Sequence, residues 1–435
     1  MSAFKLDGSR TRAGTLTLGD IFEGLFGADA PVRFSAYDGS TAGNKDARLG
    51  LRIVNPRGVS YLATAPGSLG MARAYIKGDL EIEGAHPGNP YEMLKLIDDD
   101  LRINRPPMTQ AVEWARQLGA RAFMPPPLPE QEVVPTWRRG IRHSRDRDAS
   151  SISYHYDVSN TFYEHVLGSS MTYTCACYPT EGATLEEAQA HKYDLVARKL
   201  GLQPGMRLLD VGCGWGGMVR HAAKNYGVHV IGVTLSQAQA TWAQERIETE
   251  GLDDIAQVRH QDYRDVLERD FDAVSSIGLI EHIGVKNYPA YFSFLRSRLR
   301  PGGRLLNHGI TRSDNKHPGL PRRGFIGRYV FPDGELTGSG HIVRAVEDSG
   351  LEVQHQENLR VHYAKTLHAW CDNLVANWDA CVADASLPIA KVWGLYMAGS
   401  ALAFERNNIQ LHQVLATRTA DHGASGYPLR HDFGV

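Results

Sequence analysis

Four glycines follow an acidic residue where an apolar run of the sequence ends. The segment from Leu208 to Gly217 reads LLDVGCGWGG, so that Asp210 precedes Gly212, Gly214 and Gly216. Glycine lets the backbone approach a ligand closely, and doubly wound folds bind ligands beyond the carboxyl ends of their strands. The spacing therefore predicts a loop that binds a cofactor, with a dinucleotide among the candidates. A tight turn that binds nothing is the alternative.

Two further residues with chemical potential follow later apolar runs. Glu281 comes after FDAVSSIG, and His308 lies within GRLLNHGIT. If both runs are parallel strands, both residues emerge at the same sheet edge as the glycine loop. A carboxylate there is costly to desolvate unless it is paired. An anion that shares a proton with Glu281 and accepts a hydrogen bond from His308 would satisfy it, whereas simple bonding to neighbouring loops is the alternative.

The elements that position these residues alternate from about Ser151 onward. The runs MRLLDVG, VHVIGVT, FDAVSSIG and GRLLNHGIT each predict a buried parallel strand, and LEVQHQENL predicts a further strand without a stated direction. Helical patterns lie between them at Met218–Tyr226, Ser236–Glu250 and Tyr288–Leu299. This alternation predicts right-handed βαβ units, and therefore an α/β, Rossmann-like doubly wound sheet with helices on both faces.

The earlier part of the chain has a different pattern. PVRFSAYDGS and RLGLRIVNPRGVSYLATAP alternate like strands, GSLGMARAYIKGDLEIEG is punctuated by glycines, and Pro90–Asp98 predicts a helix. We expect a smaller N-terminal α+β domain over residues 1–123 and the doubly wound domain over 151–435. Between them, residues 124–150 contain three consecutive prolines and many arginines, which is typical of an extended linker.

Composition excludes several other classes of protein. The formal net charge of -2 offers no basic footprint for nucleic acid. The N-terminus lacks the apolar core of a secretory signal, and no uninterrupted apolar stretch is long enough to span a bilayer, so we expect a cytoplasmic protein. The five cysteines lack the paired spacing of zinc ligands, so we expect reduced thiols and no metal site.

The glycine loop resembles the first motif of class I methyltransferases, in which it holds the amino-acid part of S-adenosylmethionine. One departure is informative, because the acid that usually ends the second strand is replaced by Thr234 in VTLSQAQ. That replacement is a mark of the cyclopropane fatty acid synthases, including the mycolic acid cyclopropane synthases, which the chain resembles. The resemblance rests on the segments YHYDVSNTFYEHVL, MTYTCACY, LLDVGCGWGG, VTLSQAQ, IGLIEHIG, LLNHGIT, YVFPDGEL, VHYAKTLHAW and LYMAGSALAFERNNIQLHQVL.

The resemblance implies a cofactor site for S-adenosylmethionine. Its residues are Tyr173, Thr174, Asp210, Gly212, Gly214, Trp215, Gly216, Thr234, Ser236, Gln239, Asp262 and Tyr263. Thr234 and Gln239 would bind the ribose in place of the missing acid. Asp262 and Tyr263 would hold the adenine, although a solvated loop is an equal alternative.

The resemblance also implies a bicarbonate ion that acts as the base near the sulfonium. Its site corresponds to Cys175, Glu281, His308, the backbone of Ile310, and Tyr363. Cys175 could instead be a small buried hydrophobic residue. Aromatic faces attract cations by roughly 0.5 to 2 kcal/mol each, so Tyr173, Trp215 and Tyr363 are expected beside the cationic centre, with ordinary core packing as the alternative.

These features predict transfer of a one-carbon unit to the cis double bond of an unsaturated, oleoyl-type chain in a phospholipid. Deprotonation of the resulting carbocation gives either a cyclopropane or a methylene-branched chain of the tuberculostearic type. Ser400, where many relatives have cysteine, and the divergent RFSAYDGSTAG favour the branched product. The alternatives are a methyltransferase for a small soluble substrate and a non-catalytic lipid-binding protein.

Several partners follow from this prediction. GSLGMARAYIKGDLE is similar to the lead domain of the phospholipid-acting relatives, so the N-terminal domain is expected to be lipid-carrier-like, binding lipid or forming a homo-oligomer. A reductase would act on a methylene product. A peripheral membrane surface is expected to meet a basic stretch of the linker, with the N-terminal domain or Arg322, Arg323 and Phe325 as second choices and a solvated linker as the alternative. The basic stretch comprises Trp137, Arg138, Arg139, Arg142, Arg145 and Arg147.

Overall fold

The computed structural model describes residues 16–133, 158–316 and 324–433, which form two compact units. The smaller unit contains Met1–Ala85 and Glu92–Leu128, and the larger contains His86–Tyr91 and Pro129–Val435. We expected the N-terminal domain to be continuous up to residue 123. In the structure, His86–Tyr91 belongs to the larger unit instead. Most of the expected linker, including its arginines, lies outside the described residues, as do Arg322 and Arg323.

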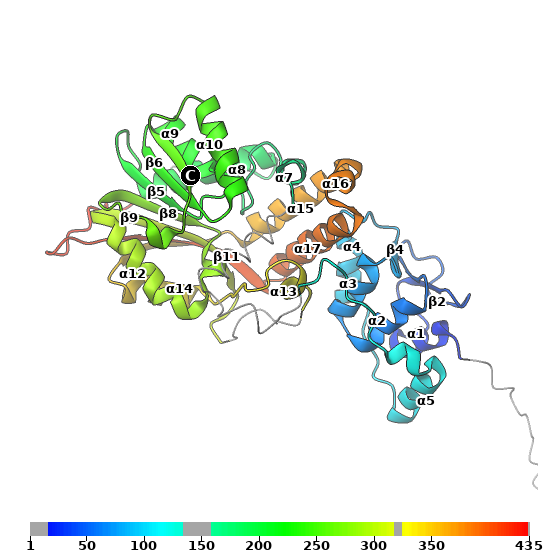
Figure 1. The fold of residues 1–435 in the computed structure, drawn as a ribbon. Coiled ribbons are helices and arrows are strands. Elements are labelled where there is room, and N and C mark those ends of the chain that lie inside the picture. The colour runs from blue at the N-terminus through cyan, green and yellow to red at the C-terminus, as the bar shows by residue number, and fades with distance from the viewer. Residues whose placement is uncertain (1–15, 134–157, 317–323, 434–435) are drawn as a thin grey trace, which may run out of the picture. The chain divides into compact units, whose positions relative to one another are not determined.

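The smaller unit has one mixed sheet with helices packed on it (Figure 1). The strand order is β2-β1-β3-β4; β1 pairs antiparallel with β2 and parallel with β3, and β3 pairs antiparallel with β4. The strands are β1 Arg33–Ala36, β2 Thr41–Gly43, β3 Gly50–Ile53 and β4 Leu80–Glu83. The helices are α1 Leu18–Phe26, α2 Pro56–Thr64, α3 Ser68–Ile76, α4 Tyr91–Asp99, α5 Met108–Leu118 and the 3-10 helix η1 Ala120–Phe123.

Helix α2 corrects the strand expected through VNPRGVSYLATAP. The Asn55 side chain accepts a hydrogen bond of 3.0 Å from the backbone of Arg57, which caps the helix. Pro56 occupies the first turn, where its fixed φ suits a helix and its missing N–H costs nothing. These two local signals outweigh the alternation of apolar residues that follows them.

The larger unit contains a seven-stranded sheet in the order β10-β11-β9-β8-β5-β6-β7. The pairs among β9, β8, β5, β6 and β7 are parallel, and β11 runs antiparallel between β9 and β10. The strands are β5 Arg207–Val211, β6 His229–Thr234, β7 Ala256–His260, β8 Phe271–Ile277, β9 Leu299–Arg312, β10 Glu352–Asn358 and β11 Ile409–Thr417. This is the predicted doubly wound sheet, extended by an antiparallel strand near one edge.

Helices cover both faces of this sheet (Figure 1). Leu208 of β5 packs among residues of α8, α9 and α10, whereas the adjacent Leu209 packs among residues of α12 and α14. Successive side chains of a strand point to opposite faces, so this one pair marks both cores. The helices are α7 Asn160–Leu167, α8 Leu185–Leu200, α9 Gly217–Tyr226, α10 Gln237–Thr249, α11 Ile280–Ile283, α12 Tyr288–Arg298, α13 Phe325–Tyr329, α14 Ser339–Asp348, α15 Arg360–Ala376, α16 Trp378–Ala385 and α17 Leu387–Glu405, with 3-10 helices η3 Tyr263–Asp265 and η4 Val285–Asn287.

Helix α17 is long and apolar enough to cross a membrane by length and composition, with 19 residues and a mean hydropathy of 1.3. However, 61% of its most apolar 18-residue stretch is buried inside the structure, and the helix packs against α15. The apolar composition of α17 is therefore accounted for by its place in the core of the larger unit.

Candidate active site

The glycine loop joins β5 to α9 in a conformation that requires glycine. The φ angles of Gly212, Gly214 and Gly216 are 75°, 55° and 73°, all in the left-handed region. A Cβ on Gly212 would lie 3.1 Å from Leu279, whereas a Cβ on Gly214 would have no atom within 4 Å. The backbone at Gly214 therefore borders open space, which is the kind of cradle that a ligand can approach closely.

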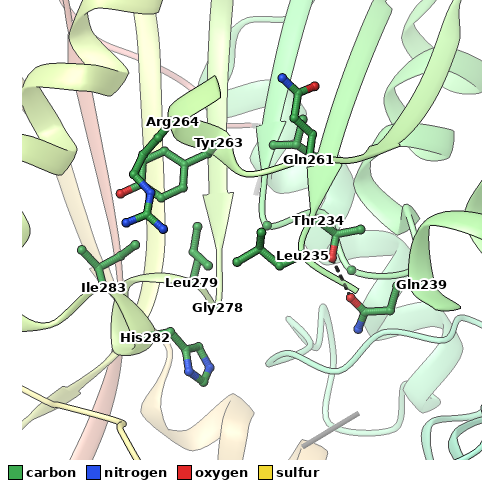
Figure 2. Close-up of a pocket in the computed structure, with 13 residues that line it drawn as sticks. Thr234, Leu235, Gln239, Gln261, Tyr263, Arg264, Gly278, Leu279, His282 and Ile283 are labelled. Carbon is green, nitrogen blue, oxygen red and sulfur yellow. Dashed lines mark hydrogen bonds between the residues drawn. The ribbon is translucent and has the colours of Figure 1, made fainter. Parts of the chain in front are cut away.

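A pocket opens beside this loop at the carboxyl ends of β5, β6 and β8. Figure 2 shows Thr234, Leu235 and Gln239 on one side of it and Leu279, His282 and Ile283 on the other. The Thr234 hydroxyl donates a 2.8 Å hydrogen bond to Oε1 of Gln239, and Oγ of Ser236 accepts from the backbone of Gln239. The sequence thus replaces the usual carboxylate by a buried hydroxyl–amide pair, as expected from VTLSQAQ.

The end of the third strand contributes differently from our expectation. Tyr263 lines the pocket together with Arg264 and Gln261. Asp262 is not among the lining residues, and its carboxylate accepts hydrogen bonds of 2.8 and 2.6 Å from the Arg264 guanidinium. The side chain of Asp262 therefore orients Arg264.

A buried cluster of polar side chains includes Asp210, which directly precedes the glycine loop. Asp210 accepts a 2.6 Å hydrogen bond from Ser275, and burial raises the pKa of Asp210 to about 6 despite that bond and the nearby Lys192. Lys192 of α8 donates a 3.0 Å hydrogen bond to Thr174, and burial lowers the pKa of Lys192 to about 7. Through Lys192, the predicted residues Asp210 and Thr174 belong to one electrostatic cluster.

Glu281 lies buried on α11, just beyond β8. Its Oε1 accepts a 2.6 Å hydrogen bond from the backbone of Ile310, and burial raises the pKa of Glu281 to about 7. Its Oε2 is also buried and has no hydrogen-bond partner in the structure. An unpartnered buried carboxylate oxygen is costly, so this atom marks a place where a proton-sharing ligand would be stabilised.

His308 lies two residues before Ile310 on β9, so their side chains share one face of the strand. The imidazole is buried, and burial together with Lys192 and Lys199 keeps its pKa well below the ordinary value. Its Nδ1 lies 3.2 Å from Nε2 of Gln413, whereas its own Nε2 is buried without a partner in the structure. The structure thus brings two unsatisfied polar atoms, from Glu281 and His308, to the same edge of the sheet.

Cys175 and Tyr363 are the remaining members of the set that the resemblance implied. The Cys175 thiol donates to the backbone carbonyl of Ala176 at 3.1 Å, and burial raises its pKa well above the ordinary value. Burial therefore favours the protonated thiol over the thiolate. Tyr363 is buried on α15, where its ring packs 4.6 Å from that of Phe404.

The predicted aromatic residues meet in one cluster. The Tyr173 ring lies 5.5 Å from both Trp370 and Trp393, and its hydroxyl donates to that of Tyr396 at 3.0 Å. Trp215, in the glycine loop, lies 4.7 Å from the ring of Tyr163. The cluster therefore joins the cofactor loop to α7, α15 and α17.

Sequence reasoning missed part of the pocket. His282 follows Glu281 directly and its ring lies 5.6 Å from that of Phe331, and Gly278 directly follows β8 with a φ of 72°. The adjacency of His282 to Glu281 and the position of Gly278 at a strand end were signals that could have identified both. The other lining residues that were not predicted are Val233, Leu235, Gln261, Arg264, Leu279 and Ile283.

The seven-stranded sheet and the glycine-loop pocket define a class I, S-adenosylmethionine-dependent methyltransferase. A family model described as "Mycolic acid cyclopropane synthetase" matches residues 143–414, and the chain belongs to this family.

Individual relatives agree with the family match. The chain is 59% identical, over 96% of its length and 98% of the relative's, to a probable fatty acid methyltransferase of Mycobacterium tuberculosis. It is 38% identical to the cyclopropane-fatty-acyl-phospholipid synthase of Escherichia coli over 62% of this chain and 68% of that one. A solved mycolic acid cyclopropane synthase, CmaA1, complexed with SAH and CTAB, is 34% identical, with a TM-score of 0.58, over 62% of this chain and 97% of that one.

Proposed function

We propose that this protein transfers a one-carbon unit from S-adenosylmethionine to the cis double bond of an unsaturated, oleoyl-type acyl chain of a phospholipid. The observation that carries the proposal is that two polar atoms, Oε2 of Glu281 and Nε2 of His308, are buried without a partner among the described residues, and that Glu281 directly precedes the pocket residue His282. Methyl transfer to an alkene leaves a carbocation that must lose a proton from carbon, and a buried site that can share a proton fits that need.

The residues of the chain have separate parts in this reaction. S-adenosylmethionine supplies an electrophilic methyl group on a sulfonium. The open backbone at Gly214 and the Thr234–Gln239 pair fit its binding. Bicarbonate would supply the base, and the resemblance assigns it to Cys175, Glu281, His308, the Ile310 backbone and Tyr363. Because the Ile310 N–H donates to Glu281, that N–H would act on the anion through the Glu281 carboxyl group.

The aromatic cluster suits both the lipid and the cation. Tyr173, Trp370 and Trp393 pack together into an apolar wall, in which Trp370 and Trp393 are buried, and ring faces attract a positive centre by roughly 0.5 to 2 kcal/mol each. Closely packed rings also exclude water, which would otherwise capture the carbocation. An alkene is a poor nucleophile, so holding it against the methyl group supplies much of the rate.

Among the two possible products, we propose the methylene-branched chain. The relative that matches nearly the whole chain is named a probable fatty acid methyltransferase, whereas the more distant relative from Escherichia coli is named for a cyclopropane product. A methylene product requires two electrons to become a methyl branch, so a separate reductase would follow this enzyme.

The decisive experiment mixes the protein with labelled S-adenosylmethionine and vesicles of dioleoyl phosphatidylglycerol. We expect label in the acyl chains, and nuclear magnetic resonance of the fatty acid methyl esters to show an exocyclic methylene. A cyclopropane ring in the product would contradict the proposed methylene branch but would support the proposed acyl substrate. Label that appears only on an added small soluble acceptor, or no S-adenosylhomocysteine at all, would refute the proposal.

A phospholipid substrate also requires a surface that meets the bilayer. In the described part of the smaller unit, large apolar side chains are exposed on α5, in the segment before it, and in η1 and just after it, and η1 packs against α5. We call them the α5 patch: Ile103, Met108, Val112, Phe123 and Met124. The exposed residues Arg102, Arg105, Arg116 and Arg121 lie among them in the sequence. Apolar side chains interspersed with arginines complement an anionic lipid surface.

Replacing Arg102, Arg105 and Arg121 by glutamine tests this docking surface. Each cation near an anionic surface contributes roughly 1 kcal/mol, so the triple variant should sediment less with dioleoyl phosphatidylglycerol vesicles at low salt. The difference should shrink at high salt. The exposed Arg344→Gln on α14 is the control. Equal sedimentation of the triple variant and the wild type would move the docking surface elsewhere.

A further inference from the structure

Four side chains from three adjacent strands and one helix form a hydrogen-bonded row that ends at His308. In the sheet register, Glu357 of β10 lies opposite Gln413 of β11, and Gln413 lies opposite His308 of β9. Lys199, near the end of α8, donates to both Glu357 and Oε1 of Gln413, the latter at 2.6 Å. The order of the row is therefore Glu357, Lys199, Gln413, His308.

The chemistry of each member leaves only one arrangement of hydrogens. Burial lowers the pKa of Lys199, and the ion pair with Glu357 opposes that shift and favours the ammonium. An ammonium has only donors, so the Gln413 amide presents its oxygen to Lys199. The amide nitrogen of Gln413 then faces Nδ1 of His308 and donates to it at 3.2 Å. A neutral imidazole whose Nδ1 accepts a hydrogen bond carries its proton on Nε2.

Burial of the row decides whether water can change its hydrogen bonds. Lys199, Gln413 and His308 are each 0% exposed, whereas Glu357 is about a third exposed at the outer end of the row. In the described part of the chain, solvent water therefore does not reach Lys199, Gln413 or His308. A water molecule cannot replace either hydrogen bond of the Gln413 amide, so the amide keeps one orientation. The Nε2 atom of His308, which has no partner, is consequently a hydrogen-bond donor.

We propose that Lys199 and Gln413 are positioning residues that hold His308 in its Nε2–H tautomer, so that His308 donates to the anion that accepts the substrate's proton. The anion belongs to the function proposed above, so the role given to the tautomer rests on that proposed function. The tautomer itself is a property of the row and can be measured without turnover.

The test variant is Gln413→Glu. A carboxylate there still accepts from Lys199, so the pocket keeps its shape, but it offers an acceptor to Nδ1 and draws the proton of His308 to that atom. In nitrogen-15 spectra of histidine-labelled protein, with His308 assigned from its loss in His308→Gln, the wild type should show a neutral Nε2–H ring. Gln413→Glu should show Nδ1–H or a doubly protonated ring.

Turnover and anion binding provide the second readout. In buffer freed of carbon dioxide, Gln413→Glu should need more added bicarbonate for half-maximal rate and should lose roughly tenfold or more in kcat, the scale of a general-base contribution. Its affinity for S-adenosylmethionine should stay within about twofold, because the row does not touch the cofactor pocket. Gln410→Glu, on the same strand but bonded to Asn407, is the matched control.

Lys199→Met is the second variant. It disturbs the row without the new negative charge that Gln413→Glu places beside His308. Without the ammonium the amide of Gln413 is free to turn over, so both tautomers of His308 should appear. A wild-type ring protonated on Nδ1, or an unchanged Nε2–H ring in both variants, would overturn the proposal. A changed tautomer with unchanged kcat would support the row and instead refute the part given to His308 in the proposed function.

Discussion

The carboxyl group of Glu281 is buried, and the consequence can be measured as stability. Burial raises its pKa from 4.5 to about 7, so between these values the folded protein keeps a proton that the unfolded chain has released. The free energy of unfolding therefore falls as the pH rises through this window. The full effect of such a shift is roughly 3 kcal/mol and is present only above the pKa of the folded state.

Glu281→Gln should remove this pH-dependent cost. We expect the variant to be more stable than the wild type by roughly 3 kcal/mol at pH 8 and by less than about 1 kcal/mol at pH 5, as measured by urea unfolding. It should retain its affinity for S-adenosylmethionine and lose roughly nine-tenths or more of its turnover. The exposed Glu245→Gln is the control. An equal difference in stability at both pH values would contradict the origin assigned to the shift.

Gly214 gives a cleaner test of the cofactor loop than its neighbours. A Cβ at Gly212 would press on Leu279, whereas a Cβ at Gly214 has no atom within 4 Å, so backbone strain at positive φ is the main cost of Gly214→Val in the free protein. We expect calorimetry to show S-adenosylmethionine binding weakened by about tenfold or more, since the valine fills the approach to the backbone. Gly423→Val, also at positive φ in open space, controls for backbone strain. Unchanged affinity in Gly214→Val would refute the loop assignment.

At the scale of elements, the parallel strands β5, β6, β8 and β9 were predictable because each contains a short apolar run flanked by helical patterns. Strand β7, AQVRH, contains no such run and was not among them. Strand β11 was not expected, since His412 and Gln413 interrupt its apolar residues even though both are buried. Their burial depends on partners in β9 and on α8, which lie far away in the sequence. For the same reason Glu281 and His308 could be predicted from strand ends, whereas Lys192, Lys199 and Gln413 could not.

Helix α17 offers a prediction in which two effects have opposite signs. Gly394 lies within the helix, and a Cβ there would lie 2.2 Å from the backbone oxygen of Pro87. Helix propensity alone predicts that Gly394→Ala stabilises by up to about 1 kcal/mol. The clash with backbone should dominate and destabilise by about 1 to 3 kcal/mol. A melting temperature above that of the wild type would show that the segment around Pro87 yields easily.

At the scale of the whole molecule, the chain passes between its two units three times, after Ala85, after Tyr91 and after Leu128. The segment that causes the first two crossings is well held within the larger unit. The ring centroids of His86 and Trp378 lie 5.1 Å apart, and those of Tyr91 and His368 lie 4.7 Å apart. The Tyr91 hydroxyl also donates a hydrogen bond to Glu405.

In genetic terms, this route makes the two units inseparable by a single cut. A gene shortened to begin after Leu128 would encode the whole sheet and every residue of the candidate active site, yet it would delete part of the packing around α17. A protease that opened the chain once, beyond Leu128, would leave both fragments carrying pieces of the larger unit. The smaller unit therefore cannot be exchanged like an independent module, and any fusion or transplantation must carry His86–Tyr91 together with the catalytic part.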